Sequence, residues 1–134
     1  MSNILKYTEE LQKDMYIDEL NLSQVALTLP AIKHKWVARL ILAKSEFNKI
    51  EQLKKDIKNN IILKLKNNNI KTSLLSLEKS LNDNEEYKNN ISKIDNDLED
   101  IKLTILYLEK VENIFKNMTY DLKNIIDLNK LETT

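Results

Sequence analysis

The chain has 134 residues, with 20 lysines, 17 asparagines and 16 isoleucines, but only one proline, one histidine and no glycine or cysteine. Phosphate-cradling loops need glycine, disulfides need cysteine, and a zinc site needs more than one histidine, so these chemistries are excluded. The formal net charge of zero does not exclude a polyanion ligand, because residues 1–29 carry −3, residues 30–71 carry +8 and residues 72–134 carry −5.

The shortage of glycine and proline predicts an all-α protein of long amphipathic helices. Residues 2–17 are expected to form a short amphipathic helix, and residues 18–29 a linker that packs on the rest of the chain. The side chains expected to point inward are Ile4, Leu5, Leu11, Met15, Leu20, Leu22, Val25 and Leu29.

A long helix is predicted from Pro30 to about residue 66, because proline is favoured at the first helical position and no later breaker stops the helix. Its apolar residues recur at steps of three, four and seven, which places them on one side. They are Ile32, Trp36, Leu40, Ala43, Phe47, Ile50, Ile57, Ile61 and Leu65.

The same helix concentrates positive charge, since residues 30–71 hold 11 basic residues and three acidic ones. Eleven residues are close to three helical turns, so four lysines with this spacing lie nearly in line: Lys33, Lys44, Lys55 and Lys66. This pattern favours polyanion binding, although a basic helix face is also commonly just solvated. The candidate contact residues are Lys33, Lys35, Trp36, Arg39, Lys44, Lys54, Lys55, Lys58, Lys64 and Lys66.

Trp36 allows two interpretations, because it lies between Lys35 and Arg39 but also on the apolar side. An exposed ring would stack on a nucleic-acid base. A lone tryptophan at such a position is more commonly part of the core.

The asparagine-rich residues 67–72 indicate a break, and Asp83 is the expected cap of a second long helix. This helix is predicted over residues 84–116, with an interruption at 117–119 where Thr119 caps a final short helix. Its apolar residues follow a heptad pattern. They are Ile91, Ile94, Leu98, Ile101, Ile105, Leu108, Val111, Phe115 and Met118.

Two long helices in so short a chain leave a thin monomeric core, so self-association is expected. The sequence therefore divides into residues 1–71, with the basic helix, and residues 72–134, an acidic self-assembly region. The residues expected to form the oligomer contact are Leu98, Ile101, Ile105, Leu108 and Phe115.

No signal peptide or membrane-spanning apolar run is present, so a cytoplasmic protein is expected. The acidic residues within 95–100 lack the glycine and spacing of a calcium loop and are interpreted as a solvated helix face. No catalytic residue, metal or cofactor is predicted.

Three segments of the chain resemble the UvsY family, the recombination mediator proteins of T-even-type phages. They are EELQKDMYID at 9–18, the segment 30–55 with Pro30, Lys35 and Trp36 at its start, and NMTYDLKNIIDLNKL at 117–131. None of them is a catalytic signature, but their order and spacing fit the family.

The resemblance implies a non-enzymatic protein that binds single-stranded DNA and forms ring-like homo-oligomers. It also implies that the protein helps a phage recombinase replace single-strand-binding protein on DNA, in the cytoplasm of the host cell. Beyond Lys55 the sequence departs from the family pattern, so Lys58, Lys64 and Lys66 are assigned to DNA from their charge alone.

Two other classes of function stay open from the sequence. A structural coiled-coil or scaffold protein would share the heptads without needing eight net positive charges on one helix. An interaction module would use the same charges to capture an acidic protein partner.

Overall fold

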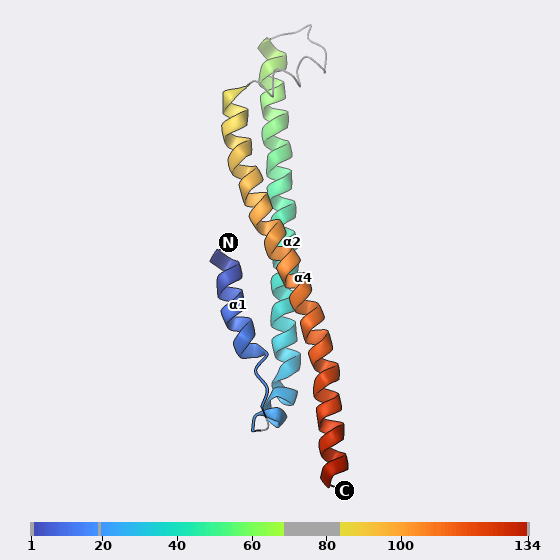
Figure 1. The fold of residues 1–134 in the computed structure, drawn as a ribbon. Helices are drawn as coiled ribbons and strands as arrows, with labels where there is room; N and C mark the ends of the chain where they lie inside the picture. Colours follow the sequence, from blue (N-terminus) through green and yellow to red (C-terminus); the bar gives the residue numbers. More distant parts are fainter. Residues whose placement is uncertain (1, 19, 69–83, 134) are drawn as a thin grey trace. The chain divides into compact units, whose positions relative to one another are not determined.

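The computed structural model describes residues 2–18, 20–68 and 84–133, which form the helices α1 (Ser2–Asp14), α2 (Leu22–Asn68) and α4 (Glu85–Thr133) (Figure 1). None of these described residues lies in a β-strand. The predicted all-α fold class is therefore confirmed.

The chain forms two compact units, each of which combines a part of α2 with a part of α4. Unit 1 contains Met1–Ala43 and Leu103–Thr134, and unit 2 contains Lys44–Lys102. The division predicted from the sequence, at residue 71, places the two long helices in different regions. The two units instead each contain a part of both helices.

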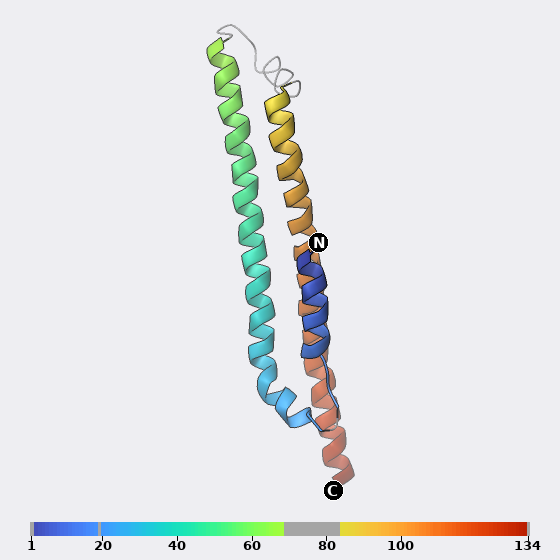
Figure 2. The same ribbon diagram turned by 90° about the vertical axis from the view of Figure 1, so that its left-hand side faces the viewer.

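Helix α2 begins eight residues earlier than predicted, at Leu22, so Pro30 lies inside it. The backbone N–H of Val25 donates to the carbonyl oxygen of Asn21 at 2.9 Å, which is the first helical hydrogen bond. The first turns of α2 run at an angle to its remainder (Figure 2), as expected for proline inside a helix. Burial of Val25 and Leu29, four residues apart, favours helix over the predicted linker.

A tight turn leads into α2. The carboxylate oxygen Oδ1 of Asp18 accepts the backbone N–H groups of Leu20 and Asn21 at 2.9 and 2.8 Å, and Oδ1 of Asn21 accepts that of Asp18 at 2.7 Å. Asx side chains commonly satisfy backbone donors in this way before a helix. Asp18 is thus a turn residue.

Helix α4 runs without interruption through residues 117–119, so the predicted break there is wrong. Thr119 does not cap a new helix, since its hydroxyl donates to the carbonyl oxygen of Phe115 at 2.9 Å within the same one. At the helix start, Oδ1 of Asn84 accepts the backbone N–H of Tyr87 at 3.0 Å, so Asn84 is a cap. The predicted cap, Asp83, lies outside the described residues, as do 69–72 of the predicted break.

The core of unit 1 is built by all three helices, since α1 covers one side of the pair formed by α2 and α4. Of the α1 residues expected to point inward, Leu11 is buried, whereas Leu5 is exposed. The buried cluster comprises Leu11, Val25, Leu29, Trp36, Leu40, Ala43, Leu108, Val111, Phe115, Met118 and Leu122.

The heptad pattern of α4 serves this internal core. Leu108 and Phe115 are only 1% and 2% exposed, and Ile105 packs against the same cluster. The expectation that these three residues contact another copy of the chain does not fit their placement. That expectation assumed a core formed by two helices only. Helix α1 and the N-terminal residues of α2 that precede Pro30 add buried side chains to this core.

Unit 2 has a smaller core between its two helical segments. Ile61 and Ile94 are buried, while Leu98 and Ile101 are half-buried. The apolar side of α2 predicted from the sequence is therefore the buried side here too.

Candidate nucleic-acid interface

The predicted DNA-contact residues of unit 2 lie on α2, whose apolar side is buried. We call Lys44, Lys54, Lys55, Lys58, Lys64 and Lys66 the basic ridge. Lys55, Lys58 and Lys66 are exposed, and none of them makes a hydrogen bond or ion pair with another described residue. No described residue therefore competes with an anionic ligand for these three ammonium groups.

Lys54 and Lys64 of the basic ridge are paired with α4 in the same unit. Lys54 Nζ donates to Asp95 Oδ1 at 2.6 Å, and Lys64 Nζ lies 3.8 Å from Glu86 Oε1. All four side chains remain substantially exposed, and ion pairs of this kind contribute little to stability.

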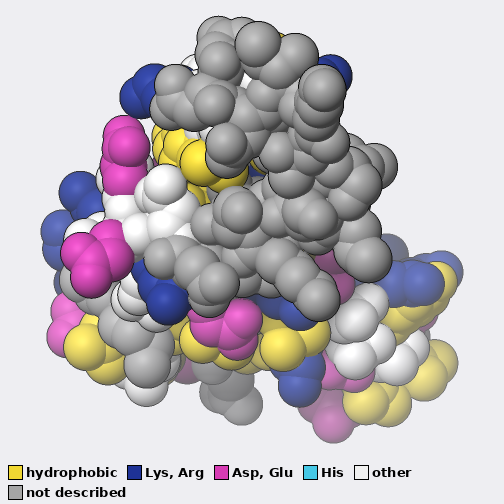
Figure 3. All heavy atoms as spheres, turned by 90° about the horizontal axis from the view of Figure 1, so that it is seen from above, with side chains coloured by type: hydrophobic (Ala, Val, Ile, Leu, Met, Phe, Trp, Pro, Cys, Tyr) yellow, Lys and Arg dark blue, Asp and Glu magenta, His cyan; other side chains and the backbone are white. Residues whose placement is uncertain are grey.

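Unit 2 is electrostatically polarised across its two helical segments. Residues 44–68 carry seven lysines and three acidic residues, whereas residues 85–102 carry three lysines and six acidic residues. Lys and Arg side chains (dark blue) and Asp and Glu side chains (magenta) are both visible in the end-on view (Figure 3). An anionic strand is therefore favoured along α2 and disfavoured along α4.

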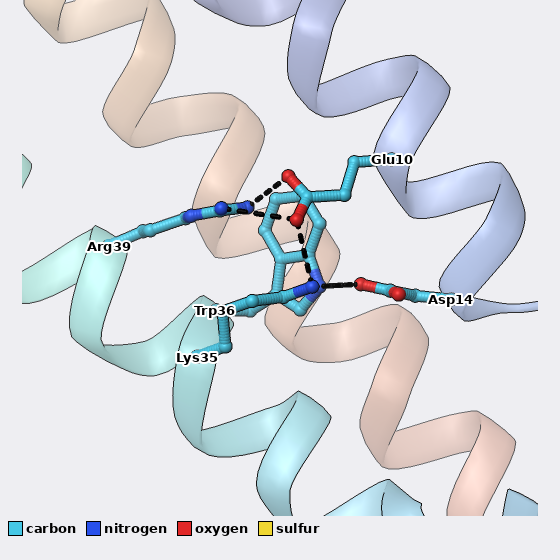
Figure 4. A network of polar contacts seen from close by, with 5 residues as sticks. All are labelled: Glu10, Asp14, Lys35, Trp36 and Arg39. Atoms are coloured by element: carbon cyan, nitrogen blue, oxygen red, sulfur yellow. Dashed lines mark hydrogen bonds and ion pairs between the residues drawn. The ribbon is translucent and has the colours of Figure 1, made fainter.

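The other basic candidates lie in unit 1 and are engaged there. Lys33 Nζ donates to the hydroxyl of Thr119 at 3.2 Å. Lys35 Nζ donates to Glu10 Oε1 at 2.9 Å and to Asp14 Oδ2 at 2.6 Å (Figure 4). The structure thus separates Lys33 and Lys35 from the basic ridge.

Arg39 holds the carboxylate of Glu10 through both of its terminal nitrogens. Nη1 donates to Oε2 at 2.6 Å and Nη2 to Oε1 at 3.2 Å (Figure 4). Its guanidinium group also lies 5.0 Å from the ring centroid of Tyr7 and 4.8 Å from that of Trp36. A bidentate, stacked arginine is well placed to fasten α1 to α2.

Trp36 belongs to the core of unit 1. It is 2% exposed, its Nε1–H donates to Asp14 Oδ2 at 2.9 Å, and its ring meets Tyr7 edge-on at 5.5 Å between centroids. A base cannot stack on a ring in this position, so the interpretation of Trp36 as a core residue fits the structure.

The polar network between α1 and α2 changes the proton affinity of its members. Hydrogen bonds from Arg39 and Lys35 lower the pKa of Glu10 to about 2. Burial tends to lower the pKa of Lys35, but hydrogen bonds to Asp14 and Glu10 outweigh it and raise that pKa. Both charges are therefore retained at neutral pH.

Replacing Glu10 by glutamine is expected to lower the free energy of unfolding by about 1–2 kcal/mol at neutral pH. This magnitude allows for solvent screening of a side chain that is 36% exposed. Because the pKa of Glu10 is about 2 in the folded protein and 4.5 without the network, its contribution is complete above pH 4.5 and disappears as the pH falls towards 2. Urea unfolding at a series of pH values measures this loss.

Glu9→Gln is the matched control, because Glu9 is the exposed neighbour and carries the same charge. Its free energy of unfolding should follow that of the wild type at every pH. A Glu10→Gln effect that stays constant down to pH 2 would show that the carboxylate charge is not what stabilises the network.

The network escaped the sequence analysis, although its spacing is visible. Glu10 and Asp14 are four residues apart, and so are Lys35 and Arg39. Two acids and two bases at the same helical spacing match when the helices pack side by side. The sequence alone did not show that these helices are neighbours.

Among the described residues, no group of three or more histidine, cysteine, aspartate or glutamate side chains is placed to hold a metal ion. None of the described helices combines the length and apolar character needed to cross a bilayer.

Comparisons with known proteins agree with this architecture. Three crystal structures of the bacteriophage T4 recombination mediator protein UvsY are similar, each with 20% sequence identity. Lattice type IV gives a TM-score of 0.73 and covers 95% of this chain and 96% of that chain. Lattice types II and I give TM-scores of 0.68 and 0.66, covering 96% and 93% of this chain and 96% and 97% of those chains. At this identity the likeness shows the fold.

Family membership follows from the sequence comparison. A search of curated proteins found no match. The family model described as "Recombination, repair and ssDNA binding protein UvsY" matches residues 10–134, which is nearly the whole chain. The protein therefore belongs to the UvsY family.

Proposed function

We propose that this protein is a non-enzymatic recombination mediator that binds single-stranded DNA through the basic ridge of unit 2. The observation that carries the proposal is that three lysines of the basic ridge, Lys55, Lys58 and Lys66, are exposed and make no hydrogen bond or ion pair with another described residue. The family description, which includes recombination and single-stranded DNA binding, supports it. Lys44 and Lys54 extend the same surface, whereas Lys64, nine residues or two and a half turns from Lys55, lies on the opposite side of α2.

Binding through this surface depends on phosphate contacts. Phe47 is the only aromatic residue among residues 44–68 and is half-buried, so α2 offers no fully exposed ring in unit 2 for bases to stack on. Lysine is a point charge that neutralises phosphates without reading base edges. We therefore expect little sequence preference and a strong dependence on salt.

The direct test is fluorescence anisotropy of a labelled oligo-dT strand titrated with the protein at two salt concentrations. We expect saturable binding that weakens steeply as salt increases, and a mixed-sequence strand should bind alike. Absence of binding at low salt would favour the alternative, a structural coiled-coil or scaffold protein.

The mediator role extends this binding to protein partners. A weak, sequence-tolerant contact with phosphates leaves the bases accessible to a recombinase. In this proposal the protein helps a phage recombinase load onto DNA that is covered by single-strand-binding protein. A strand-exchange assay with these two proteins tests the role, and no stimulation by the wild-type chain would contradict it.

We also propose that the chain forms a ring-like homo-oligomer, with its contact at the C-terminal end of α4. Of the residues first expected at this contact, Leu108 and Phe115 are buried and Ile105 packs against the cluster of unit 1, while Leu98 and Ile101 are half-buried. Ile125, Leu128 and Leu131 instead present apolar side chains to solvent at three-residue spacing, and the last two are 59% and 73% exposed. Apolar side chains so placed are stabilised when another copy covers them.

Replacing Leu128 and Leu131 by serine is expected to reduce the molar mass measured by light scattering at micromolar concentration. The helix should persist, because neither side chain contributes to the buried cluster of unit 1. The matched control replaces Leu27 and Leu42, which are also exposed leucines of unit 1. An unchanged mass in the first variant, or an equal loss in the control, would contradict this contact.

A further inference from the structure

The lysines of the basic ridge are not equivalent, because acidic side chains of α4 already contact Lys54 and Lys64. The carboxylate of Asp95 accepts a hydrogen bond from Lys54 at 2.6 Å, and that of Glu86 lies 3.8 Å from Lys64. Both pairs join the basic and acidic segments of unit 2. Each of these two ammonium groups therefore already has a negatively charged carboxylate oxygen beside it, where a phosphate oxygen would otherwise bind.

We propose that Asp95 competes with DNA phosphates for Lys54, so that unit 2 limits its own affinity for single-stranded DNA. This inference rests on the proposed function and adds a regulation of the same surface. DNA first contacts Lys55, Lys58 and Lys66, and then displaces the carboxylate of Asp95 from Lys54.

The exposure of the pair between Lys54 and Asp95 makes the exchange feasible. The carboxylate can return to water without being left buried and unpaired, so its release has a low free-energy cost. A phosphate, however, has to replace an existing contact at Lys54, whereas at Lys55 it displaces no described residue. A mediator has to release its DNA strand to a recombinase, and a limited affinity makes this release easier.

Asp95→Asn keeps the size of the side chain but removes the charge that holds Lys54. We expect it to tighten binding of labelled oligo-dT by about two- to fivefold at roughly 0.15 M salt, the range of an exposed ion pair. Glu86→Gln should have a smaller effect, because its pair with Lys64 is longer and Lys64 lies on the opposite side of α2 from Lys55. Circular dichroism confirms that each variant is folded.

Two neighbouring acids provide matched controls. Asp97 and Glu85 are exposed, lie in the same unit and make no ion pair with another described residue. Asp97→Asn and Glu85→Gln change the net charge equally, but at this salt concentration distant charges are screened. We expect the affinity of both controls to stay within about 1.5-fold of the wild type.

A double-mutant cycle decides whether the effect passes through Lys54. In a Lys54→Ala background, Asp95→Asn should no longer tighten binding. An equal gain in both backgrounds, or an equal gain from Asp97→Asn, would overturn the proposal, because it would reflect net charge alone. No gain from Asp95→Asn would also overturn it. If Lys55→Ala still weakens binding in that case, the proposed function survives, and if the wild type binds no DNA at all, both fail.

Discussion

Replacing Trp36 by alanine is expected to lower the free energy of unfolding by about 3–5 kcal/mol, the cost of truncating a large buried aromatic residue. The side chain is 2% exposed and packs against Tyr7, with Phe115 at a centroid distance of 6.4 Å. The variant also loses the hydrogen bond from its ring nitrogen to Asp14. Urea unfolding followed by circular dichroism measures the loss, because the chain's only tryptophan is then absent.

Trp36→Leu separates this core role from base stacking. Leucine keeps much of the apolar volume, so the variant should stay folded at low temperature, but it cannot stack on a base. We expect its affinity for oligo-dT to equal that of the wild type. Stacking on an aromatic side chain contributes about 1–3 kcal/mol per base, so a tenfold loss of affinity in the folded variant would show that the ring leaves the core to bind DNA.

The apolar periodicity of the sequence predicted the buried sides of the long helices correctly. Trp36, Leu40 and Ala43 on α2, and Leu108 and Phe115 on α4, are all buried. Burial follows from spacing alone, since residues three and four apart share one helix side whatever they pack against.

The ends of the helices were predicted less well, because local signals were overruled by packing. Pro30 is favoured as the first residue of a helix. Val25 and Leu29, which precede it in the sequence, are buried, and the helix extends to include them. Thr119 is a good cap, but Met118 on its N-terminal side is buried in the core, and the helix continues. Capping preferences contribute about 1 kcal/mol, which is less than burying such side chains.

The candidate site shows the same limit. Positive charge along α2 is a property of the sequence, but which lysines can meet DNA depends on their neighbours. Lys35 and Arg39 look like part of the basic surface until α1 brings Glu10 and Asp14 to them. Partners of this kind come from distant parts of the chain, and no local pattern identifies them.

Replacing Lys55, Lys58 and Lys66 together by alanine is expected to weaken binding of oligo-dT by about 30- to 100-fold at roughly 0.15 M salt. Each lysine that contacts a phosphate releases a counterion, and about 0.7 ions are released per contact with single-stranded DNA. The slope of log affinity against log salt should therefore become shallower by about two units. Stability should change little, because all three side chains are exposed and no described residue pairs with them.

The matched control for this triple variant removes the same charge from α4. Lys88, Lys93 and Lys102 are exposed, lie in unit 2 and belong to the acidic segment of that unit. Their replacement by alanine should change the affinity by less than about threefold, because the DNA strand follows α2 and screening weakens distant charges. Equal losses in both triple variants would mean that net charge alone determines binding. If neither variant lost affinity while the wild type bound DNA, the strand would follow a surface other than the basic ridge.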